Sequence, residues 1–249
     1  MMSYRCVIDE IDKKDSELAI IPIGSIEQHG PHLPVGTDWY IANALGQGIA
    51  EVTGGYLLPA LPVSTCREHM GKKGSVWMDP DVFYQMITSM LMCLKEQGFK
   101  KAATLQCHGG IFIMTPIIRQ FNAVHNPEFM AVNIDVGVLP PFDAPTDGTP
   151  PGQVEIHAGD GETSLMLHIA PETVRMELAA ASWPTVPRRY LSYGSVFRAS
   201  PIGVWGDPTK ATAEKGCQML SRLIKSSLEE MKSAFAFLES KEKFGYSHF

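Results

Sequence analysis

The sequence lacks long apolar runs, paired cysteines and an excess of positive charge. No stretch approaches the ~20 apolar residues of a membrane-spanning helix, and residues 1–15 lack the apolar core of a signal peptide. Its five cysteines form no Cys-x-x-Cys pair, which favours free thiols over a disulfide framework or a structural zinc site. We therefore expect a cytoplasmic protein with no membrane partner.

A basic surface is also missing. Lys and Arg number 21 against 27 Asp and Glu, which gives a formal net charge of −6. Because binding to a nucleic-acid backbone needs a positively charged face, nucleic acid is not an expected partner. A hydrophobic content of 45% and a charged content of 19% exclude a disordered chain.

Apolar patterns of strand type alternate with patterns of helix type along the 249 residues. Strands are predicted at 18–23, 56–59, 102–107 and 129–134, and helices at 40–52, 80–97, 111–124, 162–168 and 217–238. Asp79-Pro80 and Asp207-Pro208 each place a capping aspartate before a proline, which predicts a helix start at both sites. The alternation predicts an α/β fold in one domain over 1–249, with a mostly parallel central sheet and helices on both faces.

Polar residues gather where the predicted strands end, which is where open α/β sheets bind ligands. Glu27 and His29 follow the first strand two residues apart, so in an extended segment they point the same way. Asp38 lies where the next helix begins and can turn its carboxylate toward the same pocket. His108 follows a later strand and precedes two glycines, which leave room for close approach.

A further polar cluster, Glu155 to Ser164, closes a loop at 137–152 that holds five prolines and three glycines. Its ionisable residues are Glu155, His157, Asp160 and Glu162. A loop of this length inside a compact domain is more often functional than idle.

Two imidazoles and three carboxylates form a mixed nitrogen and oxygen donor set. Such a set suits a divalent cation such as Zn²⁺, Mn²⁺ or Fe²⁺. Five protein ligands exceed what one catalytic zinc takes, and one carboxylate can bridge two ions. We therefore expect one or two ions at this site.

The same motifs resemble the creatininase (creatinine amidohydrolase) family. The resemblance rests on IPIGSIEQHGPHLPVGTD at 21–38, HGG at 108–110, HAGDGETS at 157–164 and GVWGDPTKATAEKG at 203–216. It implies a metal-dependent hydrolase on a three-layer α/β/α fold, often assembled as a hexamer. It also implies the metal ligands, which are Glu27, His29, Asp38, His108 and Glu162, with Asp38 as the bridging carboxylate. It further implies that His157 lies beside the substrate and transfers protons.

Two positions depart from creatininase itself. Creatininase carries an acidic ligand two residues after the strand histidine, where this chain has Gly110. It also uses tryptophans near its substrate loop, whereas residues 137–156 contain none. Creatinine is therefore not the expected substrate, and Glu162 gains importance as a ligand.

Several residues also have ordinary structural interpretations. His157 could anchor a loop, and a carboxylate such as Glu162 is favoured at any helix start by the helix dipole. His32 is expected to pack or to support a ligand, and Cys107 to be an inert buried thiol. For His69 a place beside the substrate and a plain surface position remain equally open.

The leading functional hypothesis is hydrolysis of a small cyclic or linear amide by a metal-activated water, with His157 protonating the leaving nitrogen. Ring opening of a cyclic ketone or keto-sugar, and removal of a formyl group, need the same polarised carbonyl. A hypothesis of another class is a metal-binding partner in peptide maturation without turnover. We also expect a homo-oligomer, to whose interfaces Trp77, Trp183 and Trp205 could contribute.

Overall fold

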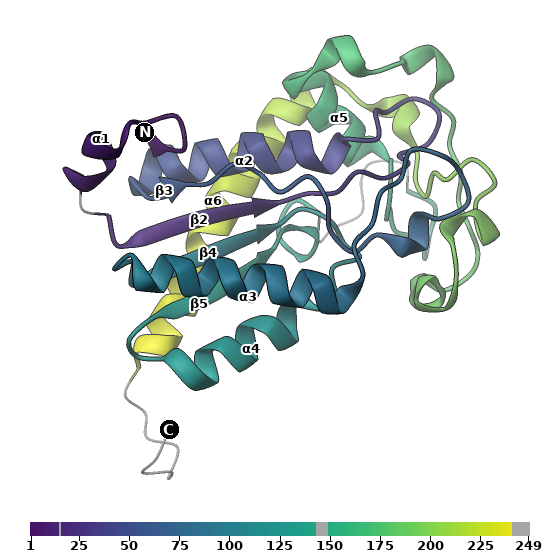
Figure 1. Cartoon of the computed structure of the whole chain (residues 1–249). Coiled ribbons are helices and arrows are strands. Elements are labelled where there is room, and N and C mark those ends of the chain that lie inside the picture. Colours follow the sequence, from purple (N-terminus) through teal and green to yellow (C-terminus); the bar gives the residue numbers. More distant parts are fainter. Residues whose placement is uncertain (15, 143–148, 241–249) are drawn as a thin grey trace.

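The protein is built around a five-stranded sheet in which all strands run parallel (Figure 1). The computed structural model describes residues 1–14, 16–142 and 149–240. Within them the strand order is β1-β3-β2-β4-β5. The strands are β1 (Met2–Ser3), β2 (Leu18–Ile23), β3 (Tyr56–Leu57), β4 (Lys101–Gln106) and β5 (Met130–Asp135).

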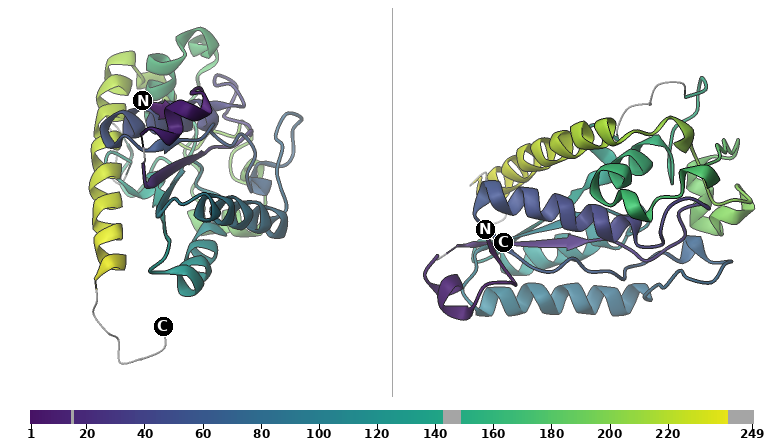
Figure 2. Two further views of the ribbon diagram at one scale, coloured as in Figure 1. Left: turned by 60° about the vertical axis from the view of Figure 1, so that its left-hand side comes forward. Right: turned by 90° about the horizontal axis from the view of Figure 1, so that it is seen from above.

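Helices cover both faces of this sheet, so the predicted three-layer α/β/α fold is confirmed (Figure 2). One face packs against α2 (Thr37–Thr53), α5 (Asp160–Ile169) and α6 (Ala213–Glu239), and the other against α3 (Pro80–Glu96) and α4 (Met114–His125). Successive residues of β2 alternate between the two cores: Ile20 joins the α2 side, whereas Ala19 and Ile21 join the α3 side. Because strand side chains point alternately to opposite faces, a strand buried on both sides has to be apolar throughout.

The registers bring the carboxyl ends of the central strands together. In the β2–β4 pair, Leu18 lies opposite Lys101 and Ile23 opposite Gln106, so both strands end at the same level. Residues that follow Ile23 and Gln106 therefore emerge side by side at one edge of the sheet, which positions the site described below.

Helix ends match the sequence prediction in one case and differ in another. Asp79 precedes Pro80 at the start of α3, as predicted. Asp207 instead caps a short 3-10 turn, with its carboxylate accepting a hydrogen bond from Thr209 N, and α6 begins later with Thr212 as its N-cap. The Asp-Pro signal is local, so it specifies one turn but does not determine whether a long helix follows.

Short elements escaped the sequence prediction because they have too few residues to show a period. They are β1, α1 (Ile8–Asp12) and several 3-10 turns, including Arg67–His69 and Arg188–Tyr193. The middle of the predicted loop at 137–152, residues 143–148, lies outside the described residues. Among the helices that the structure describes, none is both long and apolar enough to span a bilayer.

Candidate metal centre

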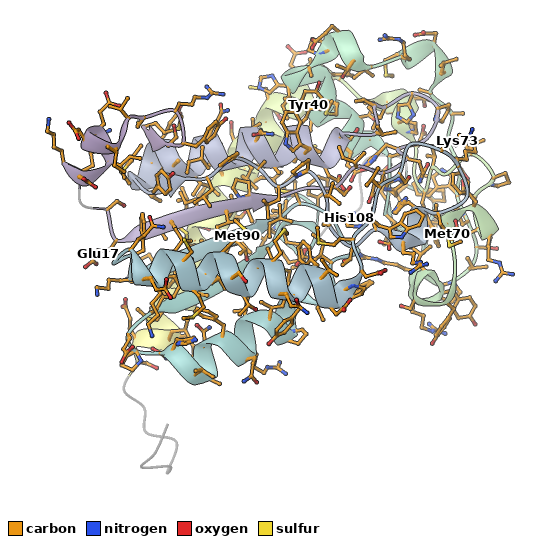
Figure 3. The ribbon with its side chains drawn as sticks, viewed as in Figure 1. Glu17, Tyr40, Met70, Lys73, Met90 and His108 are labelled. Atoms are coloured by element: carbon orange, nitrogen blue, oxygen red, sulfur yellow. The ribbon has the colours of Figure 1, made fainter. Side chains whose placement is uncertain are left out.

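The polar residues singled out in the sequence meet beyond the carboxyl ends of β2 and β4. His108 follows the end of β4 by two residues and lies at the edge of the sheet (Figure 3). Glu27 and His29 come from the segment after β2, and Asp38 lies in the first turn of α2. All four side chains are buried, so they face one another rather than solvent.

Two carboxylates contact the same nitrogen of His108, and we call these three side chains the His108 set: Glu27, Asp38 and His108. Nδ1 of His108 lies 3.1 Å from Oε2 of Glu27 and 3.2 Å from Oδ2 of Asp38. These separations are similar to those between neighbouring ligands of one cation with bonds of about 2.1 Å.

A second group, the His29 set, contains His29, Asp38 and Glu162. Nε2 of His29 lies 3.1 Å from Oδ1 of Asp38 and 3.9 Å from Oε2 of Glu162. The other ring nitrogen of His29, Nδ1, lies 3.1 Å from the backbone carbonyl of Glu27 and donates to it. This bond turns Nε2 toward the two carboxylates, so a cation that displaced the proton on Nε2 would meet the lone pair of a metal ligand.

Asp38 joins the two sets through different oxygens. Its Oδ1 faces His29 and its Oδ2 faces His108. The hydroxyl of Ser25 donates to Oδ2 at 2.9 Å and holds the carboxylate in this position. A carboxylate in this arrangement can contact two ions at once, as a bridging ligand does.

Glu27 provides a direct test of whether these residues fit a cation. Its carboxylate is fully buried, and neither oxygen accepts a hydrogen bond of good geometry within the described part of the chain. The nearest basic groups are Nε2 of His69 at 3.2 Å and Nδ1 of His108 at 3.1 Å. Burial raises the pKa of Glu27, the largest effect on that group. Because a buried charge without a partner is costly, a divalent cation suits this carboxylate.

The histidines of this centre fall into two groups according to the direction in which their pKa values are shifted. Burial on its own would lower the pKa of His29, but Asp38 and the other nearby carboxylates raise it to about 10. His108 has a raised pKa in the same way, through Glu27 and Asp38. By contrast, burial and nearby imidazoles hold the pKa values of His69 and His157 well below the ordinary value.

His157 is fixed so that one nitrogen faces the centre. Its Nε2 donates to the backbone carbonyl of Gln28 at 2.7 Å, while Nδ1 lies 3.8 Å from Oε1 of Glu27. The next residue, Ala158, has a φ of 52°, an uncommon conformation for a residue with a side chain. Its N–H donates to Glu162, which links the ligand candidate to the turn that carries His157.

His69 lies in the same buried group of side chains, so the alternative that it is a plain surface histidine is wrong. It is buried, with Nε2 near Glu27 and Nδ1 accepting from Nε2 of Gln28 at 2.9 Å. Sequence reasoning did not assign His69, and it missed Gln28 and Glu68 altogether. The only signal was the pair Glu68-His69 in a segment without periodicity, which folds as a 3-10 turn.

These atoms give three overlapping groups that could hold a metal ion, each with its ligand atoms within 4.8 Å of one another. The groups are Glu27 with His69 and His108, Glu27 with His29 and His157, and His29 with Asp38 and Glu162.

This chain is similar to proteins of a known family. The family model described as creatininase, creatinine amidohydrolase, matches residues 5–231. The chain belongs to the creatininase family. It is therefore a hydrolase of that family, as the sequence motifs predict.

The curated proteins to which this chain is similar act on different substrates. It is 30% identical over 224 residues to a mycofactocin precursor peptide peptidase of Mycobacterium ulcerans, covering 82% of this chain and 80% of the relative. It is 27% identical over 239 residues to a 3-dehydro-scyllo-inosose hydrolase of Thermotoga maritima, covering 85% and 75%. The crystal structure of creatininase superposes with a TM-score of 0.79 at 19% identity, covering 94% of this chain and 98% of that one.

Other residues of the creatininase-family motifs have structural roles in this chain. Asp160 is buried and accepts from Ser164 and Lys215, and Glu155 accepts from the N–H groups of Asp160 and Asp207. Both therefore hold the turn that carries the site rather than line the ion position.

Three further residues lie within the motifs or next to them. His32 is buried, and its Nε2 lies 2.9 Å from the hydroxyl of Thr163, so it packs against the helix that carries Glu162. Burial raises the pKa of the Cys107 thiol, consistent with an inert thiol. Trp205, expected at an interface, is buried because its backbone pairs with that of His157.

Two cavities flank the centre. One of about 360 Å³ lies against His157, Glu162 and apolar residues that include Phe142. The other, of about 310 Å³, lies against Glu27, His108 and His157. Arg188 lines both cavities, so each of them has this basic side chain in its wall.

Proposed function

We propose that this creatininase-family hydrolase cleaves the C–N bond of a small cyclic or linear amide with one or two divalent ions. The observation that carries the proposal is the arrangement of the His108 set and the His29 set around the two oxygens of Asp38. The carboxylate of Glu27 supports it, because neither of its buried oxygens has a hydrogen-bond partner within the described residues and a cation would satisfy them.

The identity of the ion is part of the proposal. Nitrogen and oxygen donors without sulfur suit Zn²⁺, Mn²⁺ or Fe²⁺. Solved creatininases include a manganese form and a zinc–zinc form of a variant, which support the first two. When bound, the ion would polarise a carbonyl and lower the pKa of a water molecule.

His157 is the proposed proton-transfer residue. Burial, followed by the nearby His29, holds the pKa of His157 below its ordinary value, so the ring is neutral at pH 7. Since Nε2 donates to the Gln28 carbonyl, the free lone pair is on Nδ1 and faces the centre. Nδ1 can then accept the proton of the attacking water and return it to the leaving nitrogen.

Ring opening of a cyclic ketone or keto-sugar is the second candidate, with removal of a formyl group as its variant. The 3-dehydro-scyllo-inosose hydrolase relative supports ring opening. A deformylase relative, 28% identical over 117 residues, supports the variant. Each reaction needs a polarised carbonyl and a proton donor, which the same residues can provide. The peptide peptidase relatives are themselves hydrolytic, so they favour turnover over the non-hydrolytic peptide-maturation role.

The test combines metal analysis with a substrate screen. Purified protein is analysed for zinc, manganese and iron, and then supplied with each ion and with cyclic amides, short peptides, formamides and cyclic ketones. We expect at least one bound ion per chain and turnover of an amide. Turnover of ketones alone would replace the first candidate by the second, and a protein that binds none of the ions would refute both.

We further propose that the protein is a cytoplasmic homo-oligomer of the hexameric kind. Family membership supports this assembly, as do large exposed apolar side chains such as Phe112 and Tyr193. Light scattering on purified protein tests it, and a monomeric mass would contradict it.

A further inference from the structure

The space beside His108 is filled by a side chain from a distant part of the sequence. A Cβ atom placed on Gly110 would overlap Oε1 of Glu68 and crowd Nε2 of His108. The backbone of Gly110 has no positive φ, so the requirement for glycine here is one of space and not of conformation. Glu68 therefore occupies the volume that any side chain at position 110 would need.

Glu68 contacts the ring nitrogen of His108 that faces away from the centre. Its Oε1 lies 3.0 Å from Nε2 of His108, whereas Nδ1 faces Glu27 and Asp38. A carboxylate oxygen accepts from a ring N–H, so Nε2 of His108 carries a proton and donates it to Glu68. A neutral ring in this state has its lone pair on Nδ1, directed at the two carboxylates of the His108 set.

The turn that carries Glu68 is tied to the segment after β4. The hydroxyl of Thr65 donates to the backbone carbonyl of Gly110 at 3.2 Å. His69, the next residue after Glu68, is buried against Glu27. These contacts on either side fix the position of the Glu68 carboxylate, whose side chain is only 14% exposed.

His29 also needs a hydrogen-bond partner for the ring nitrogen that faces away from the centre, but its partner is a backbone atom. Its outer nitrogen, Nδ1, donates to the main-chain carbonyl of Glu27. His108 has no such carbonyl partner among the described residues and uses the Glu68 side chain instead. The orientation of His29 is therefore built into the backbone, whereas that of His108 depends on one replaceable residue.

We propose that Glu68 is a positioning residue that holds His108 with Nδ1 toward the ion, and that Gly110 serves to admit it. An acidic group supplied by the 67–69 turn thus occupies the space that a side chain at position 110 would need. Partners of this kind fix the tautomer and the ring plane of a ligating histidine. The proposal rests on the proposed metal site.

The test measures the affinity for Zn²⁺ and Mn²⁺, each alone, by competition with a chromophoric chelator. Glu68→Ala is expected to weaken one of two ions by about 10–100-fold and to leave the other unchanged. Glu68→Gln is expected to remain within a few-fold of the natural protein, because its amide oxygen can still accept from Nε2. Gly110→Ala is expected to weaken the same ion as Glu68→Ala. Asp79→Ala is the matched control, because this exposed carboxylate contacts Arg67 of the same turn but not His108.

Unchanged affinity in Glu68→Ala would overturn the proposal. Equal losses in Glu68→Ala and Glu68→Gln would also overturn it, because they would show that charge or direct ligation matters and not hydrogen-bond acceptance. A natural protein that binds neither ion would instead refute the proposed function. In that case the crystal structure of metal-free Glu68→Ala decides: a turned or disordered His108 ring supports positioning, and an unchanged ring contradicts it.

Discussion

The His108 set and the His29 set differ in how closely their atoms meet. The two contacts of His108 Nδ1 are 3.1 and 3.2 Å, whereas in the other set Glu162 stands 3.9 Å from His29. The tight set takes Glu27 and His108 from the ends of two neighbouring strands. The looser set depends on α5, which follows a long loop. The difference therefore lies in Glu162, which has to move closer to His29 to share an ion with it, whereas the atoms around His108 are already in contact.

Removing the shared residue should affect both sets and have the largest effect. Asp38→Ala is expected to lose both ions and to reduce kcat by about 1000-fold or more, since metal-assisted activation of water would be lost. Elemental analysis and steady-state rates measure this. Asp81→Ala is the matched control, because Asp81 is an exposed acid in the first turn of α3, as Asp38 is in the first turn of α2. Retention of metal and turnover in Asp38→Ala would contradict the account.

His157 separates chemistry from metal binding. His157→Gln is expected to retain the ion content while kcat falls about 100- to 10,000-fold, as removal of a general acid–base group does. His125→Gln, on the far end of α4, serves as the control and should keep the natural rate. An unchanged rate in His157→Gln would remove this residue from the mechanism.

Two conservative substitutions compare the sets directly. Glu27→Gln is expected to weaken one ion by about 100-fold or more, because it removes the negative charge and one oxygen donor of a fully buried carboxylate. Glu162→Gln is expected to weaken the other ion by about 10-fold, since its side chain is 20% exposed and lies farther from His29. Calorimetric titration of each variant resolves the two. The opposite ranking would show that the geometry does not reflect the strength of binding.

Over less than one pH unit, the pH dependence of ion binding should be the smallest of these effects. Nearby carboxylates raise the pKa of His29 to about 10, so the ring carries a proton at pH 7 that an ion must displace. Affinity should therefore rise with pH up to about 10, roughly tenfold per pH unit for each proton released. Calorimetry in buffers with different heats of ionisation counts these protons. Binding without proton release at pH 7 would contradict this charge assignment.

The sequence predicted the strand-end half of the centre because the reasoning is local. Glu27 and His108 follow apolar strands, and parallel strands end at one edge of the sheet, so their meeting follows from the fold class. Glu68 was not predictable in this way. It lies 40 positions from His108 in a 3-10 turn, and only the packing of that turn against the β4 end reveals their contact.

Other differences have a similar physical origin. Asp207 and Asp79 have the same capping signal, yet only Asp79 directly precedes a long helix. A cap specifies one turn, and tertiary packing determines whether the helix continues. Trp205 resembles an interface residue in sequence, but its backbone pairing with His157 draws it into the interior. Such pairings between distant segments leave no periodic trace in the sequence.

The central claim is that two ions share Asp38, and anomalous diffraction from crystals soaked in Mn²⁺ or Zn²⁺ tests it most directly. The account predicts two peaks about 3.5–4 Å apart, one beside Glu27 and His108 and the other beside His29 and Glu162. A single peak within the His108 set would reduce the centre to one ion. The absence of any peak at these residues at saturating metal would contradict the account.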